Sequence, residues 1–116
     1  MFCWGCGNLF HYRELEDLLR YTTGWDCTMW ELMKVGERRI TMMRHLNARR
    51  GFTRDDDRLP ERLAEPIPDG PATGRQVSVE NLLKMLDMYY ELMGWDIQTG
   101  NPGRGKLFEL GLEWTL

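Results

Sequence analysis

The chain has 116 residues, 42% of them hydrophobic and 28% charged, a composition typical of one globular domain and not of a disordered or fibrous chain. Its net charge of -3 gives no general electrostatic reason to bind nucleic acid or an anionic membrane surface, so neither partner is expected. No apolar run approaches the ~20 residues that span a bilayer, and no signal peptide pattern opens the sequence, so a cytoplasmic protein is expected.

The first predicted element is a short helix over residues 12–22 with three leucines on one face. Gly24 is expected to end it in the left-handed conformation. Trp25 would then fold back onto Leu19 and Arg20, which is the hydrophobic contact that accompanies such a cap.

The longest predicted helix covers roughly residues 28–50. Thr28 and Glu31 form the capping box that opens it, and Gly51 ends it. Gly36 lies inside this helix at a cost of about 1 kcal/mol relative to alanine, so we expect another element to pack closely against that turn.

Residues 52–77 hold four of the five prolines, which predicts a long irregular connection with a brief helical turn over residues 60–63. A loop of this length is uncommon in a compact domain unless it has a use, and we expect it to wrap a neighbouring surface.

Ser78 is expected to cap a third helix that ends at Gly94, after which Trp95 repeats the role of Trp25. The buried stripe of this helix is predicted to comprise Leu82, Leu83, Leu86, Tyr89, Tyr90 and Met93. A last short helix is expected over residues 106–110. Because no segment alternates with a period of two, the predicted fold is all-α, a multihelical orthogonal bundle of about four helices with one long Pro/Gly-rich loop.

Cys3 and Cys6 have the two-residue spacing that lets two thiolates hold one metal or form a redox disulfide. No second pair of cysteines or histidines completes a zinc site, and three cysteines are too few for a [4Fe–4S] cluster, so any cluster would need ligands from another polypeptide. On spacing alone, two reduced thiols without a metal are favoured over a metal site.

Asp55, Asp56 and Asp57 allow either a solvated turn or paired carboxylates for acid/base chemistry, and the turn is favoured because adjacent side chains diverge. Arginines of the long helix recur at spacings that can pair with Glu37 or with this acidic run. They form either a charged helix face or an anion site.

Spaced residues of unusual type recur along nearly the whole chain. They include Gly36-Glu37-Arg38, Arg44, Asn47, Arg49, Gly51-Phe52, Arg54, Asp57, Leu59-Pro60, Arg62, Tyr89-Tyr90-Glu91-Leu92, Gly94-Trp95-Asp96, Gly100, Pro102, Lys106-Leu107 and Leu110-Gly111-Leu112, with Thr23-Gly24-Trp25-Asp26 upstream. This set resembles the C-terminal region of the tungsten-containing aldehyde:ferredoxin oxidoreductase family.

The resemblance implies an N-terminal segment, residues 1–11, that carries a candidate cluster cysteine, and a helical C-terminal oxidoreductase domain, residues 12–116. It maps Cys6, with Cys3 second, to the family's fourth cluster ligand, and it carries Cys27 over to no role. The tungsten (or molybdenum) bis-pterin and the other [4Fe–4S] ligands belong to the N-terminal catalytic part of the family.

The implied function is that of a fragment or split subunit that walls the pterin and iron–sulfur site, where an aldehyde is oxidised to a carboxylic acid and ferredoxin takes the electrons. Alone, the chain is expected to be inert and to bind no cofactor. The alternative is a free-standing helical interaction module that keeps the fold without catalysis.

Two structural expectations accompany this assignment. Helix packing and Arg–Asp pairs around Arg38, Arg54, Asp57 and Arg62 would pin the long loop against the rest of the enzyme. Eight methionines and five tryptophans predict an exposed apolar face, through which the isolated chain would dimerise or pack heavily against neighbours.

Overall fold

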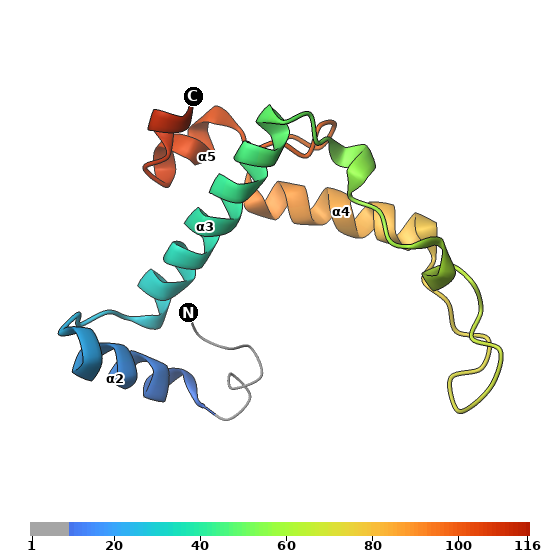
Figure 1. The fold of residues 1–116 in the computed structure, drawn as a ribbon, viewed down its shortest axis with the longest axis horizontal. Helices are drawn as coiled ribbons and strands as arrows, with labels where there is room; N and C mark the ends of the chain where they lie inside the picture. The colour runs from blue at the N-terminus through green and yellow to red at the C-terminus, as the bar shows by residue number, and fades with distance from the viewer. Residues whose placement is uncertain (1–9) are drawn as a thin grey trace. The chain divides into compact units, whose positions relative to one another are not determined.

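The computed structural model describes residues 10–116, which form four α-helices, three short 3-10 helices and no strand (Figure 1). One isolated β-bridge, between Trp95 and Pro102, is the sheet-like pairing within this range. The predicted all-α class is confirmed. No helix in the same range is long and apolar enough to cross a bilayer. The chain divides after Arg39 into two compact units, which are described separately below.

Helix α2 (Tyr12–Thr23) ends as predicted at Gly24, which has φ +73° and donates its backbone N–H to the carbonyl of Arg20 (2.9 Å). This cap satisfies one carbonyl that the helix leaves unpaired. Trp25 differs from the expectation, because the residue is 44% exposed. Its backbone N–H donates to the hydroxyl of Thr23 (3.2 Å). The similar tetrapeptides at Gly24 and Gly94 therefore share a helix stop but not a buried tryptophan.

Helix α3 (Met29–Arg49) begins at the predicted capping box. The backbone N–H of Thr28 donates to the Glu31 carboxylate (2.8 Å), and the N–H of Glu31 donates to the Thr28 hydroxyl (3.3 Å). The carboxylate of Glu31 accepts both the backbone N–H and the hydroxyl of Thr28 (2.9 Å for the hydroxyl), and these two bonds lower the pKa of Glu31 because they stabilise its charged form. The prediction that another element packs closely against Gly36 is wrong for the part of the chain that the structure describes, since a Cβ built there would meet no neighbouring atom within 4 Å.

The connection from α3 to α4 is the predicted long loop, with two helical turns inside it, η1 (Arg54–Asp56) and η2 (Glu61–Leu63). The second lies where the sequence predicts a turn. The loop closes on itself through backbone bonds from Ile67 N–H to Arg75 O (2.9 Å) and from Val77 N–H to Leu63 O (2.9 Å). The loop therefore satisfies some of its own backbone hydrogen-bonding groups without forming a strand.

Helix α4 (Val79–Met93) starts at Ser78, whose hydroxyl accepts the N–H of Asn81, and stops at Gly94 with φ +66°. Its end is a Schellman motif: Gly94 N–H donates to Glu91 O (3.1 Å), and Trp95 N–H donates to Tyr90 O (2.8 Å). This motif returns the chain over the last turn and brings Trp95 onto Tyr90. The folding back of Trp95 is confirmed.

Helix α5 (Arg104–Glu109) begins two residues before the predicted start, because the carbonyl of Gly103 already accepts the N–H of Leu107 (3.2 Å). Together with η3 (Glu113–Thr115) it encloses a small buried cluster of Leu107, Leu110 and Leu112. The end of the chain is tied to α3, since His45 Nε2 lies 3.1 Å from the Thr115 carbonyl.

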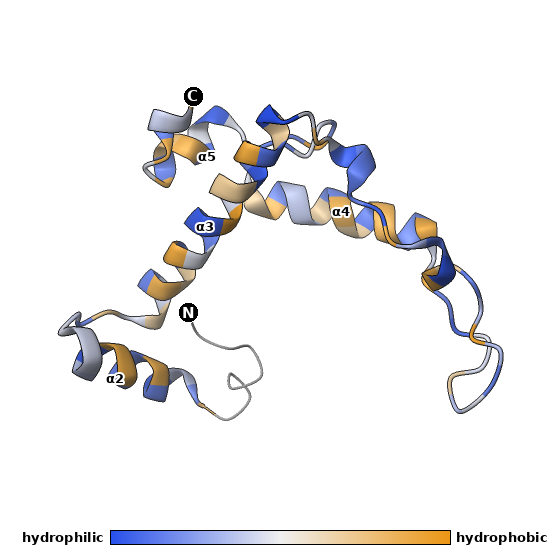
Figure 2. Ribbon diagram, viewed as in Figure 1, coloured by the Kyte–Doolittle hydropathy of each residue, from blue (hydrophilic) through white to orange (hydrophobic). Residues whose placement is uncertain are grey.

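The expected exposed apolar surface is present in the second unit. In the predicted stripe of α4 only Tyr90 is fully buried, while Leu83 is 47% and Tyr89 41% exposed. Hydrophobic residues recur along α3 and α4 (Figure 2), and several are largely exposed, among them Ile40, Met43, Leu46, Met85, Met88 and Leu92. A surface of this kind is unusual for a domain that works alone.

The two glycine environments predict opposite effects of the same substitution. Gly36→Ala should raise the free energy of unfolding by about 0.5–1 kcal/mol, because alanine favours the helix and meets open space. Gly94→Ala should lower it by about 1–2 kcal/mol, since its φ of +66° suits glycine and the new Cβ would lie 2.7 Å from Lys106 Cε. Chemical denaturation of both variants checks the signs, and a destabilised Gly36→Ala would restore the close-packing expectation.

Candidate functional site

The Arg44 guanidinium, on a side chain only 10% exposed, joins three segments of the second unit. Its Nη1 donates to Asp57 Oδ1 (2.8 Å), and its Nη2 lies 2.7 Å from Asp57 Oδ2, which makes a bidentate ion pair. Its Nε donates to the carbonyl of Gly100 (2.8 Å). One side chain of α3 thus fixes both the loop that follows it and the turn after α4.

Tyr90 completes this arrangement from α4, because its hydroxyl donates to Asp57 Oδ2. Burial raises the pKa of Tyr90 to about 12, with further contributions from the hydrogen bond and the negative charge of Asp57; Arg44 and Arg54 act in the opposite direction. Tyr90 is therefore a neutral donor over the ordinary pH range. We refer to Arg44, Asp57, Tyr90 and Gly100 as the Arg44 cluster.

An aromatic group covers one side of the cluster. The Trp95 ring lies against Tyr90, with centroids 6.1 Å apart and planes inclined by 29°, and it meets Tyr89 edge to face at 5.5 Å. The Arg44 guanidinium carbon is 5.9 Å from the Tyr90 centroid and 5.8 Å from the Trp95 centroid, within the range of cation–π attraction.

Gly100 is required where the turn approaches these side chains. Its φ is +69°, and a Cβ at this position would lie 2.9 Å from Tyr90 Cζ and closer still to the Arg44 guanidinium. Only glycine lets the backbone carbonyl reach Arg44 without displacing the tyrosine.

The ion pairs differ in partner from those expected. Asp57 is held by Arg44, while Arg54, one of the three arginines expected beside it, pairs with Asp87 (2.6 Å) and donates to the Ile97 carbonyl (2.7 Å). The three aspartates do not converge, as the turn interpretation predicts: Asp56 caps η1 by accepting the N–H of Thr53 (2.8 Å). Asp57 alone turns inward.

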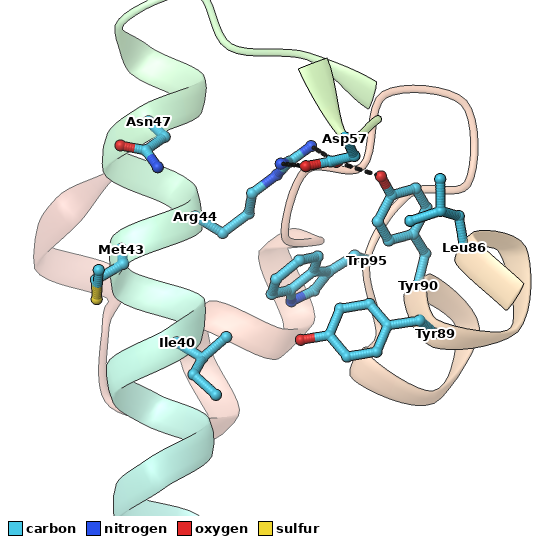
Figure 3. A pocket seen from close by; sticks show the side chains of 9 residues that line it. All are labelled: Ile40, Met43, Arg44, Asn47, Asp57, Leu86, Tyr89, Tyr90 and Trp95. Atoms are coloured by element: carbon cyan, nitrogen blue, oxygen red, sulfur yellow. Dashed lines mark hydrogen bonds and ion pairs between the residues drawn. The ribbon is translucent and has the colours of Figure 1, made fainter. Parts of the chain in front are cut away.

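A pocket of about 310 Å³ opens beside the cluster (Figure 3). Its lining combines the cluster with apolar side chains of α3 and α4: Ile40, Met43, Arg44, Asn47, Asp57, Leu86, Tyr89, Tyr90 and Trp95. The indole of Trp95 is 8% exposed, and its Nε1 is buried without a hydrogen-bond partner in the described part of the chain. We refer to this cavity as the Trp95 pocket.

The predicted cluster ligands, Cys6 and Cys3, lie outside the described residues. Between residues 10 and 116, no group of three or more His, Cys, Asp and Glu side chains is placed to hold a metal ion. Cys27, which has no assigned role, is a buried free thiol before α3.

The sequence-based reasoning missed the convergence of Arg44, Asp57, Tyr90, Trp95 and Gly100 on one place. The signal was present, because all five belong to the spaced set that carries the family resemblance. Their spacing along the chain does not reveal the contact, since Arg44 and Gly100 are 56 positions apart.

Asp57→Asn should lower the free energy of unfolding by about 2–4 kcal/mol, because it leaves a largely buried guanidinium without its counter-charge. The matched control is Asp87→Asn, which breaks the more exposed pair with Arg54 and should cost less than about 1 kcal/mol. Urea denaturation measures both. Equal effects would show that the Arg44 pair is no more important than a surface pair.

Tyr90 should ionise in the folded chain in a late step, near pH 12. Because its pKa is raised from about 10 to about 12, its stabilising contribution is fully present below about pH 10 and is lost as the pH rises through about 12. Tyr90→Phe should remove the step near pH 12 from a tyrosinate absorbance titration, and Asp57→Asn should move it to lower pH. A step near pH 12 that persists in Tyr90→Phe would contradict the assignment.

Comparison with known proteins shows which family this chain resembles. A family model described as "Aldehyde ferredoxin oxidoreductase, domains 2 & 3" matches residues 1–112. The tungsten-containing aldehyde ferredoxin oxidoreductase of Pyrococcus furiosus is 41% identical over 101 residues, or 85% of this chain and 16% of that protein. Its counterpart in Pyrococcus abyssi is 39% identical over 86% of this chain and 16% of that protein.

Two further relatives carry other names. The WOR-like subunit of an aliphatic sulfonate oxidoreductase of Pyrococcus furiosus is 39% identical over 51% of this chain and 9% of that protein. Among solved structures, the active site complex BamBC of benzoyl coenzyme A reductase matches with a TM-score of 0.70 and 26% identity, covering 91% of this chain and 14% of that one. The chain spans about 16% of the length of the tungsten-containing relatives and matches their C-terminal region. It belongs to the aldehyde ferredoxin oxidoreductase family.

Proposed function

We propose that this chain serves, as a fragment or split subunit, as the C-terminal wall of the pterin and iron–sulfur site of an aldehyde:ferredoxin oxidoreductase. The whole assembly would oxidise an aldehyde to a carboxylic acid and pass the electrons to ferredoxin. The observation that carries this proposal is the family match, which extends from residue 1 to residue 112 and so includes both candidate cluster cysteines.

The thiol of Cys6, with Cys3 as the second candidate, would supply one ligand to a [4Fe–4S] cluster whose other ligands come from the rest of the assembly. Thiolates are the usual ligands of such clusters, and a bound cluster carries single electrons.

The Arg44 cluster supports a structural role for the helical part. Its charges are paired within the chain, and the Tyr90 hydroxyl keeps its proton well above neutral pH. Such a group holds the loop and the turn in place and does not exchange protons with a substrate at neutral pH. It would give the wall a fixed shape.

Substrate choice is expected to lie elsewhere in the assembly. Related proteins are named for an aldehyde, an aliphatic sulfonate and benzoyl coenzyme A, although each of them matches at least half of this chain. A domain shared among three different substrates is a poor candidate for the residues that distinguish them.

The test is the native mass of the chain in an anaerobic extract of its host, with tungsten and iron measured in the same chromatographic peak. Elution in a larger particle that contains both metals is expected. A metal-free peak near 13.7 kDa would overturn the proposal and favour a module without catalysis.

Within that particle, Cys6→Ser should reduce the iron content and the broad visible absorption of the cluster relative to tungsten. Cys27→Ala is the control, because its thiol is buried before α3 and has no proposed ligand role. If both Cys6→Ser and Cys3→Ser retain the full cluster absorption, the ligand assignment is wrong.

A further inference from the structure

We propose that the Trp95 pocket is the place where the remainder of the oxidoreductase docks on this domain. An apolar side chain of that polypeptide fills the pocket, and a neighbouring backbone carbonyl accepts the hydrogen of Trp95 Nε1. This inference rests on the proposed function, which supplies the partner, and it adds the surface and the chemistry of the contact.

The first observation is the indole donor. The side chain of Trp95 is more than nine-tenths buried, yet its Nε1 has no hydrogen-bond partner among the described residues. In Figure 3 this nitrogen faces the part of the pocket near Ile40 and Tyr89. A buried indole N–H ordinarily finds an acceptor, so the pocket lacks one oxygen that a docked segment can bring.

The second observation is the charge of the lining. Arg44 and Asp57 neutralise each other in a bidentate pair, so the pocket offers no net charge to an occupant. Its remaining walls are largely apolar, with Ile40 and Met43 from α3 and Leu86 from α4. The fitting occupant is therefore an uncharged apolar group with one adjacent acceptor, as a hydrophobic residue within a polypeptide provides.

The third observation is that the apolar surface extends beyond the pocket. Ile40, Met43 and Tyr89 line the pocket, but they are 46%, 50% and 41% exposed. Met43 also lines a neighbouring apolar cavity of about 170 Å³ that reaches Trp114. A small ligand in the pocket would leave this rim in water, whereas a polypeptide surface would cover both.

The length of the relatives supplies a polypeptide of the required kind. The matching region spans about 16% of the tungsten-containing relatives, so the larger part of those proteins lies outside it. Within such an assembly, the exposed apolar side chains at the rim of the pocket become an interface.

The position of the contact is tested by photo-crosslinking. The chain is produced in its host with a photoreactive amino acid in place of Met43 at the rim, or in place of Leu92, which is 82% exposed on α4 and does not line the pocket. Mass spectrometry should identify an adduct between position 43 and an oxidoreductase polypeptide of the tungsten-containing particle, with little or none from position 92.

The outcomes separate this inference from the function on which it rests. A tungsten-containing particle without an adduct at position 43, with equal adducts at both positions, or with an adduct to a second copy of this chain overturns the docking site alone. Absence of any tungsten-containing particle overturns the proposed function and the docking site with it.

The indole hydrogen bond is tested by Trp95→Phe, which keeps an aromatic ring and removes the donor. The affinity of the full chain for the oxidoreductase polypeptide recovered from that particle should fall about 2- to 10-fold, the usual worth of one neutral hydrogen bond. Trp30→Phe makes the same change at an exposed indole that lines neither cavity and should leave the affinity unchanged.

A purely structural role predicts a different pattern. Loss of the packed indole lowers the melting temperature of the isolated Trp95→Phe chain on either account, because the ring stacks on Tyr90 and lies near the Arg44 guanidinium. The affinity, measured well below that melting temperature, separates the two: docking through the N–H predicts weaker association, and a purely structural role predicts unchanged association. An affinity within 2-fold of the original chain would overturn the role of the indole donor.

Discussion

The arrangement of the second unit depends on one charged group, the guanidinium of Arg44. A cation in a largely buried position must be paired and hydrogen-bonded, and Arg44 meets this demand through Asp57 and the Gly100 carbonyl. Each bond comes from a different segment of the chain. The electrostatic requirement of one side chain therefore fixes the positions of a loop and a turn that have little apolar packing of their own.

The end of α4 contributes a second constraint, which is steric. The Schellman motif at Gly94 directs the chain back over the last helical turn, so that Trp95 stacks on Tyr90 and lies within cation–π distance of the Arg44 guanidinium. A helix stop that is visible in the sequence thus decides where a binding surface forms. The turn to Gly100 follows from the same reversal.

The elements with local causes were predictable. Capping residues and glycines gave the limits of α2, α3 and α4 to within one residue, because each limit depends on bonds between near neighbours. Long-range partners were not predictable: any of several arginines could have reached Asp57, and which one does depends on tertiary packing. The packing predictions for Trp25 and Gly36 were wrong for a similar reason, since the local sequence does not say which face of an element another part of the chain covers.

The long loop has a consequence for how this domain can vary. Its backbone bonds between Leu63 and Val77 and between Ile67 and Arg75 close the segment on itself, and the residues between them are almost all exposed. Extra residues inserted near Gly70 would lengthen the exposed tip of this closed loop without moving Asp57 or the start of α4. Since the entropy of closing a loop grows only slowly with its length, related chains are free to differ here in length, and the tip is a natural place for an inserted tag.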